Sequence, residues 1–294
     1  MELILKKEAD NTALAKWLQT VSVLSDSIVL ELRNEKGIPV FVTKTFDETK
    51  SHVRRAEITL SECGIEVVKC IDGAGLECTD WNNILIGIHQ NLKKFISIIN
   101  TVTSTECEIT IKYEDNPQLK IQGEEGKEDT YATLGVIFKT DTLDLTFEAF
   151  KIHMFTFLDD YIYNNVVFQS LQPAHITLSP QLITNIEQIS GIYSVDPKKE
   201  LLNFYNKGNV LYVRHRERKY DYKLGELKID PEYENVLENK CIDIMILRNM
   251  FIESFKEIKT NTVMTFSTLL GQADRVLLEA DMMKTVIVKI DDNI

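Results

Sequence analysis

The feature that most constrains the fold of this chain is a pattern that occurs four times along its 294 residues. Each copy begins with a stretch in which apolar residues recur every three to four positions, which is typical of an amphipathic helix. Two or more short runs of alternating apolar and polar residues follow, as in antiparallel strands with one wet face. Because the stretches begin near residues 10, 91, 179 and 247, the pattern indicates an internal repeat of one supersecondary unit.

Four helices are predicted from these stretches. The first covers residues 10–24, with Asp10 or Asn11 at its N-cap. The second begins near Asn91, the third begins with Ser179 and Pro180, and the fourth covers residues 247–259. The residues expected to face the core are Leu14, Trp17, Leu18 and Val21 in the first, Leu92, Phe95, Ile96, Ile99 and Val102 in the second, Leu182, Ile186 and Ile189 in the third, and Leu247, Met250, Phe251, Phe255 and Ile258 in the fourth.

The runs between the helices predict hairpins and strands. Expected strand pairs are residues 28–33 with 38–43, 108–113 with 119–122, and 203–205 with 210–214, and further strands are expected at 263–268 and 276–279. This pattern predicts an α+β fold with two similar domains, each with two helices on antiparallel sheets. The expected division is residues 1–150, a connector at 151–175, and residues 176–294.

Composition excludes several classes of protein. Apolar residues make up 44% and charged residues 27% of the chain, which is ordinary for a folded globular protein. No apolar stretch approaches the ~20 residues that a membrane-spanning helix needs, and the N-terminus lacks the features of a secretion signal. The five cysteines are unevenly spread, so structural disulfides are not expected. We expect an intracellular location. They are Cys63, Cys70, Cys78, Cys107 and Cys241.

A search for catalytic and cofactor motifs finds none with the required context. The sequence Gly73-Ala74-Gly75 lacks the rest of a phosphate-binding loop, and the histidines are scattered singly, without metal-ligand spacing. Acidic pairs such as Glu124-Glu125 and Asp159-Asp160 fall in expected turns, where a solvated carboxylate is the ordinary interpretation. The sequence therefore predicts a protein that is not an enzyme and holds no cofactor or metal.

Charge is the more informative feature. The net charge is −12, which should repel nucleic acid at long range and disfavours a simple basic-patch DNA binder. Three expected helices nevertheless carry basic residues on their outer faces, namely Lys16, Lys93, Lys94, Arg248, Lys256 and Lys259. These side chains either solubilise exposed helix faces or contact phosphates.

In the order of its elements, the chain resembles the DNA sliding clamps, the family that includes proliferating cell nuclear antigen and the clamps of tailed bacteriophages. The most similar stretch covers residues 176–290. It contains Ile176-Thr177-Leu178-Ser179 before the third helix, the Gly208-Asn209 turn, residues 220–227, Ile244-Met245-Ile246 before the fourth helix, and a strand that ends in Glu279-Ala280. Residues 1–150 show the same plan and end in a second such strand, residues 143–149, with Glu148-Ala149. The third helix departs from the family in having no Lys or Arg, and the first domain carries an acidic insertion at about residues 123–129.

The resemblance implies a ring, a homotrimer with its helices around a central hole through which double-stranded DNA passes. The contacts with phosphates would then be weak and independent of sequence. The implied inner-face residues are Lys16, Lys93, Lys94, Lys198, Lys199, Arg248, Lys256 and Lys259. The implied partners are a DNA polymerase and an ATP-dependent clamp loader. The location would be the cytoplasm, that of the host for a phage protein, or the nucleus for a eukaryotic one.

Two further sites follow from the resemblance. Subunits would join edge strand to edge strand, through segments that contain Leu143, Leu145 and Phe147 on one side and Tyr220, Tyr222 and Leu224 on the other. A partner peptide would bind beside the connector and the C-terminal strand, in a pocket formed by Phe155, Phe157, Val288 and Ile290.

Two alternatives remain open at this point. One is a monomeric protein with the clamp fold that binds DNA and polymerase without closing a ring. The other is a non-catalytic viral structural or interaction protein built from duplicated β-rich domains.

Overall fold

The computed structural model describes most of the chain. The described residues are 1–46, 52–79, 81, 83–115, 131–152, 171–194, 196, 199–215, 220–231, 241–256, 258–268, 273–281 and 283–290. Most of the expected connector, the strand expected at 119–122 and the acidic insertion lie outside these residues. No described helix has the length and apolar character needed to cross a membrane.

The chain forms two compact units. The first unit comprises Met1–Thr45 and Arg55–Phe157, and the second comprises Phe46–Arg54 and Leu158–Ile294. Residues 46–54, a short piece of the N-terminal half, thus belong to the second unit. The division expected from the sequence did not foresee this.

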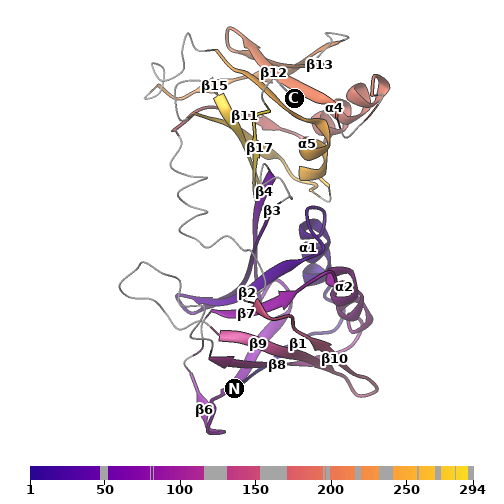
Figure 1. The fold of residues 1–294 in the computed structure, drawn as a ribbon, viewed down its shortest axis with the longest axis vertical. Helices are drawn as coiled ribbons and strands as arrows, with labels where there is room; N and C mark the ends of the chain where they lie inside the picture. Colours follow the sequence, from indigo (N-terminus) through magenta and orange to yellow (C-terminus); the bar gives the residue numbers. More distant parts are fainter. Residues whose placement is uncertain are drawn as a thin grey trace. The chain divides into compact units, whose positions relative to one another are not determined.

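The first unit carries two helices and the strands of the N-terminal half. The helices, α1 (Ala13–Val21) and α2 (Leu92–Thr101), contact each other and lie side by side in Figure 1. The strands are β1 (Glu2–Lys7), β2 (Ile28–Glu35), β3 (Ile38–Phe46), β4 (His52–Thr59), β5 (Ile65–Ile71), β6 (Glu77–Cys78), β7 (Ile84–Ile88), β8 (Cys107–Asp115), β9 (Tyr131–Lys139) and β10 (Asp144–Glu148). Their order is β4-β3-β2-β7-β9-β8-β1-β5-β6, and β10 pairs with β9.

The second unit repeats this plan. Its helices, α4 (Pro180–Ile192) and α5 (Arg248–Ser254), also contact each other. The strands are β11 (Leu171–Leu178), β12 (Leu201–Lys207), β13 (Val210–His215), β14 (Asp221–Glu226), β15 (Lys228–Ile229), β16 (Asp243–Leu247), β17 (Thr262–Thr268), β18 (Ala273–Ala280) and β19 (Met283–Val288). They form the orders β14-β13-β12-β16 and β15-β11-β17-β18-β19, and β19 is followed by β4, whose first residues belong to this unit.

The internal repeat is confirmed as four copies of a β-α-β-β-β module. Each unit contains two of them, β1-α1-β2-β3-β4 and β7-α2-β8-β9-β10 in the first, β11-α4-β12-β13-β14 and β16-α5-β17-β18-β19 in the second. The first strand of each module in the first unit pairs within its partner module, since β1 pairs with β8 and β7 with β2. By position, β10 is therefore the equivalent of β19, and β4 is the equivalent of β14.

This equivalence corrects one comparison made on the sequence. The two Glu-Ala endings do not mark equivalent strands, because Glu148 ends β10, the last strand of its module, whereas Glu279 lies on β18, the second-to-last. Two short strand ends of similar composition fit either position, since both strands have one buried face.

Two hairpins have the turn chemistry that the sequence predicts. Lys36 and Gly37 both have positive φ, 54° and 87°, and join β2 to β3 with Glu35 opposite Ile38. Such a two-residue turn matches the twist of the strands and favours Gly because a Cβ is disfavoured there. Gly208, with φ of 58°, makes the corresponding turn between β12 and β13.

Helices α1 and α4 agree with their predictions only in part. The N-cap of α1 is Thr12, so neither Asp10 nor Asn11 holds the position expected for it. Asp10 has a φ of 60°, and the Asn11 side chain accepts a hydrogen bond from the Ala13 amide one residue before the N-cap. Ser179 caps α4 as predicted, its Oγ accepting from the Leu182 amide at 3.2 Å. In α4 the fully buried apolar residues are Ile183 and Ile186, while Leu182 and Ile189 are only partly buried.

The α5 helix is shorter than predicted. It ends at Ser254, whose Oγ donates back to the Met250 carbonyl at 2.7 Å, a contact that weakens helix continuation. Phe255 then turns into the core and its ring packs on Phe251, with centroids 4.8 Å apart. Phe255 therefore lies on the inward face that the helical period predicts, although the helix ends before it.

Candidate nucleic-acid interface

The outer face of α1 and α2 is basic. Lys16, Lys93 and Lys94 are exposed, and neither helix contains an Asp or Glu. None of the three has an ion pair with another residue in the described part of the chain. The remaining exposed positions, among them Gln19, Ser97 and Asn100, are polar and uncharged. This face can therefore offer positive charge to an anion without competition from a carboxylate on either helix.

The position of the two α2 lysines is informative. Lys93 and Lys94 lie in the first turn of the helix, whose N-cap, Asn91, makes no side-chain capping bond. Cations at a helix N-terminus are unfavourable, because the helix dipole is positive there. Phosphate groups at this end would be attracted by both the lysines and the dipole. The sequence period places these lysines outward correctly, since Leu92, Phe95, Ile96, Ile99 and Val102 are buried.

The helices of the second unit do not offer the same charge. α4 has no basic residue, and its exposed face carries Gln181, Thr184 and Gln188 with one acid, Glu187. Hydroxyl and amide groups can donate hydrogen bonds to phosphate oxygens but add no net attraction.

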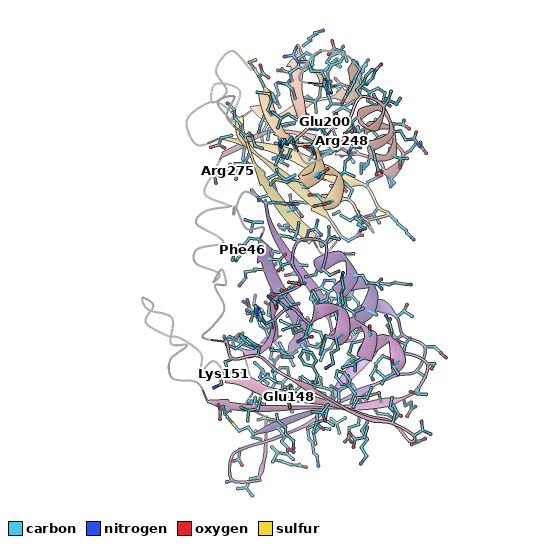
Figure 2. The ribbon with its side chains drawn as sticks, turned by 45° about the vertical axis from the view of Figure 1, so that its right-hand side comes forward. Phe46, Glu148, Lys151, Glu200, Arg248 and Arg275 are labelled. Carbon is cyan, nitrogen blue, oxygen red and sulfur yellow. The ribbon has the colours of Figure 1, made fainter. Side chains whose placement is uncertain are left out.

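Arg248, an expected inner-face residue, is bound within its own unit. Its Nε donates to Ser190 Oγ at 2.7 Å and its Nη2 to the Glu187 carbonyl at 3.1 Å, at the C-terminal end of α4. It also pairs with the buried Glu200 carboxylate at 3.7 Å (Figure 2). Only 11% of the Arg248 side chain is exposed. The expectation that Arg248 presents an open cation was wrong, because Glu200, the Ser190 hydroxyl and the Glu187 carbonyl take its donors.

The other expected cations of the second unit do not form a helical stripe. Lys256 lies in a turn and Lys259 in irregular chain, both exposed and both beyond the end of α5. Lys199 is exposed beside Asp196, with Nζ 4.0 Å from the carboxylate. Lys198 lies outside the described residues. The stripe predicted for Arg248, Lys256 and Lys259 fails because the helix ends before it can align them.

The two strands expected at a subunit contact are both edges. Within the described residues β10 pairs only with β9, and β14 is the last strand of its sheet. Phe147 of β10 is buried, its ring 4.9 Å from that of Phe95, and Leu224 of β14 is buried in the core of the second unit. These two side chains therefore serve their own cores. Leu143, Leu145, Tyr220 and Tyr222 are partly exposed.

The expected partner pocket is described only in part. Phe155 and Phe157 lie outside the described residues, while Val288 and Ile290 are partly exposed. Sequence reasoning missed a small apolar cluster, formed by Phe46, Val53, Leu277 and Val286, all of the second unit. Because Val276 and Leu278 face the main core, Leu277 faces the other side of the sheet. The run Val276-Leu277-Leu278, apolar on both faces, is the signal that could have found it.

A pocket of about 470 Å³ lies beside the end of β10. It is lined by His89, Asn91 and Lys94, from the segment that leads into α2, and by residues 146–150. Among the described residues, no group of three or more His, Cys, Asp or Glu side chains is placed to bind a metal ion.

Comparison of sequences identifies no relative, since no family model and no curated protein matches the chain. Comparison of structures does. Proliferating cell nuclear antigen from Thermococcus kodakaraensis superposes with a TM-score of 0.58 at 9% identity, over 99% of this chain and 100% of that one. The PCNA2-PCNA3 complex of Sulfolobus tokodaii gives 0.57 at 11% identity, over 98% and 99%.

The chain has the sliding-clamp fold.

Two other structures with this fold were solved with bound peptides. The PCNA of A. fulgidus, bound to the C-terminal region of FEN-1, matches with a TM-score of 0.59 at 10% identity, over 99% of this chain and all of that one. The Helicobacter pylori beta clamp bound to a DNA ligase peptide matches with 0.56 at 14% identity, over 100% of this chain and 68% of that one. The α+β architecture of two repeated units is that of the sliding-clamp fold.

Proposed function

We propose that this protein is a DNA sliding clamp, a non-catalytic processivity factor that encircles duplex DNA as a ring of identical subunits and tethers a DNA polymerase. The fold, the module that occurs four times in the chain, and the basic face of α1 and α2 support this proposal. We place its action wherever that polymerase replicates DNA, in a cytoplasm or a nucleus.

The observation that carries the proposal is a matched pair of open sheet edges. In the second unit, β19 has the start of β4 as its neighbour. The strands equivalent to these two, β10 and β14, have no such neighbour within the described residues. Pairing β14 of one copy with β10 of the next would satisfy both edges in the same way. Because this contact joins two different surfaces, repeating it builds a ring when the rotation closes. A homotrimer is the number we propose.

Within such a ring the α1 and α2 face supplies the contact with DNA. Lys16, Lys93 and Lys94 would meet phosphates without reading bases, so the contacts would be weak, sensitive to salt and tolerant of sliding. Lys256, Lys259 and Lys199 would add charge from outside the helices, and Lys198 stays a prediction. The net charge of −12 disfavours adhesion of DNA to the rest of the surface, so retention would depend on enclosure.

The partner peptide would bind beside the buried apolar cluster of Phe46, Val53, Leu277 and Val286, where Val288 and Ile290, on the same strand and its extension, are partly exposed. This site lies on the sheet face opposite the main core of the second unit. The proposed partners are a DNA polymerase and an ATP-dependent loader, because a closed ring cannot thread onto circular DNA unaided. Phe155 and Phe157 stay predictions for this site.

The experiment is a test of topology. The protein is threaded onto a linear duplex, both ends are blocked with biotin and streptavidin, and retention is measured by gel filtration before and after one internal cut. The proposal expects retention that is lost on cutting. Binding that is unchanged by the cut would contradict enclosure and favour the monomeric alternative.

A pair of charge reversals tests the basic face in the same assay. Lys93→Glu with Lys94→Glu should lower retention on blocked DNA about tenfold at physiological salt, since each lost phosphate contact weakens binding. The control is Lys36→Glu with Lys69→Glu, two exposed lysines away from α1 and α2 with the same change in net charge. Equal retention of both double variants would contradict the role of α2.

A further inference from the structure

We propose that the pocket beside β10 is a socket for the next copy of this chain, and that its occupant is the aromatic tip formed by Tyr193 and Tyr220. This inference rests on the proposed ring, and it names side chains that would hold the subunits together. The socket belongs to the first unit of one copy and the tip to the second unit of another.

The socket is open and partly polar. Its floor and walls come from His89, Asn91 and Lys94 before and within α2, and from Thr146 to Phe150. The His89 and Phe150 rings lie with centroids 4.6 Å apart, and the Phe150 amide donates to the Gly87 carbonyl at 2.8 Å. The end of β10 is thereby held against β7, which gives the socket a fixed aromatic wall with Lys94 at its rim. Its volume, about 470 Å³, exceeds that of one tyrosine side chain.

The tip is exposed and apolar. Ile192 is 74% and Tyr193 38% exposed at the C-terminal end of α4, among the most exposed large apolar residues that the structure describes. The Tyr193 ring stacks on Tyr220, with centroids 5.6 Å apart and planes at 25°. Tyr220 in turn lies 5.9 Å from the His215 ring. The tip is therefore pre-organised, which lowers the entropic cost of seating it in a partner.

Strand direction brings the socket and the tip to the same place. Tyr220 directly precedes β14, and the socket lies at the C-terminal end of β10. If β14 and β10 pair antiparallel, as nearly all neighbouring strands of this fold do, the first residues of β14 lie opposite the last residues of β10. The shared ladder then ends where Tyr193 and Tyr220 of one copy face His89 and Phe150 of the next.

The surrounding charges are complementary. Exposed acids near the tip are Glu187 on α4, Asp221 at the start of β14, which pairs with Lys207, and Asp196 just beyond the helix, which pairs with Lys199. Exposed bases near the socket are Lys93, Lys94 and Lys151, the last of which follows β10 (Figure 2). Glu148 is the one acid among the lining residues, and the hydroxyl group of the exposed Tyr193 can donate to such a carboxylate. A tyrosine suits a socket with one apolar wall and one polar rim.

The test measures the dissociation constant of the oligomer by sedimentation for four forms of the full chain. Tyr193→Ala removes the tip and Ala149→Trp fills the socket, and each should raise the dissociation constant at least about tenfold, as for a central aromatic contact. Leu76→Ser is the matched control, because Leu76 is 66% exposed in a turn away from β10. It should stay within about twofold of the wild-type chain.

The outcomes separate this inference from the ring itself. If the wild-type chain forms an oligomer and the Tyr193→Ala and Ala149→Trp variants have the same dissociation constant as it does, the socket is refuted and the proposed ring is not. A wild-type chain that stays monomeric would overturn both.

Tyr193→Trp provides a readout that does not need a weakened variant. The emission of the new indole should shift to the blue on assembly, because it would leave water for the socket. Emission that stays constant as the oligomer is diluted apart would contradict the contact.

Discussion

Arg248 shows how far a single residue can be read from the sequence. Its helical period and its charge suggest an open cation. Arg248 does lie on a helix and is basic, but its side chain is not open to solvent. Its three partners come from two other segments, Ser190 and Glu187 on α4 and Glu200 before β12. No spacing rule foretells that these segments meet. Arg248 at the C-terminal end of α4 also complements the helix dipole, so its structural role is physically well founded.

Replacing Arg248 with Ala should destabilise the protein by about 2–4 kcal/mol, because it removes the arginine partner of the buried Glu200 carboxylate. The measurement is urea unfolding, with the exposed Lys256→Ala as control. If Arg248→Ala keeps full stability and instead loses retention on blocked DNA, Arg248 is a phosphate contact after all.

A buried thiol predicts a loss of stability in alkali. Burial, reinforced by nearby Glu62 and opposed by Lys7, raises the pKa of Cys63 from 9.0 to about 12. Between these values the unfolded chain releases the Cys63 proton while the folded chain keeps it, so stability falls as pH rises above about 9. The loss from this group approaches about 1.4 kcal/mol per pH unit within that window.

The check is the free energy of unfolding at pH 8, 9 and 10 for wild type, Cys63→Ala and Cys241→Ala. Cys63→Ala should show a shallower decline, whereas Cys241→Ala, which removes an exposed thiol, should follow the wild type. Parallel curves for all three would show that Cys63 does not titrate differently on folding.

At the scale of elements, the sequence predicts best what is local. The hairpins at Gly37 and Gly208, the cap at Ser179 and the inward face of α2 follow from turn chemistry and period. The end of α5 does not, because the hydrogen bond from Ser254 Oγ to the Met250 carbonyl competes with continuation of the helix. The Glu-Ala strand endings were misleading because the local composition fits more than one strand of a module.

Residues 46–54 belong to the second unit, whereas the division expected from the sequence placed them in residues 1–150. Arg54 on β4 is fully buried in the second unit, where its Nε donates to Thr285 Oγ1 at 3.1 Å and its Nη2 to the Glu253 carbonyl at 3.4 Å. Beside it, His52 Nε2 lies 2.9 Å from Ser254 Oγ. Burial lowers the pKa of Arg54 to about 10, so it stays charged at neutral pH.

Arg54→Met should therefore destabilise the protein by about 2–4 kcal/mol, since it leaves buried acceptors unpaired and removes a buried charge from its partners. Arg55→Met is the matched control. Arg55 pairs with Glu57 and its side chain is 20% exposed, so its loss should change the free energy of unfolding by less than about 1 kcal/mol. Equal effects of the two substitutions in urea unfolding would refute a special role for Arg54.

For the whole molecule, repetition is what the sequence reveals most reliably. Four modules, and hence two similar units, follow from the recurrence of helix and strands without any identical residues. Which edges stay open does not follow, because it depends on β4 lying beside β19 while β10 and β14 have no equivalent neighbour among the described residues. The proposal that the protein encloses DNA, rather than adhering to it, rests on these open edges together with the basic face of α2.

The measurement that tests this account most directly is the mass of the wild-type protein in solution, by sedimentation equilibrium over a wide range of concentration. A closed ring of three copies predicts a species near three times 33.8 kDa that does not grow further with concentration, because every edge is then paired. A protein that sediments as a 33.8 kDa monomer throughout, or one that assembles without limit, would contradict it.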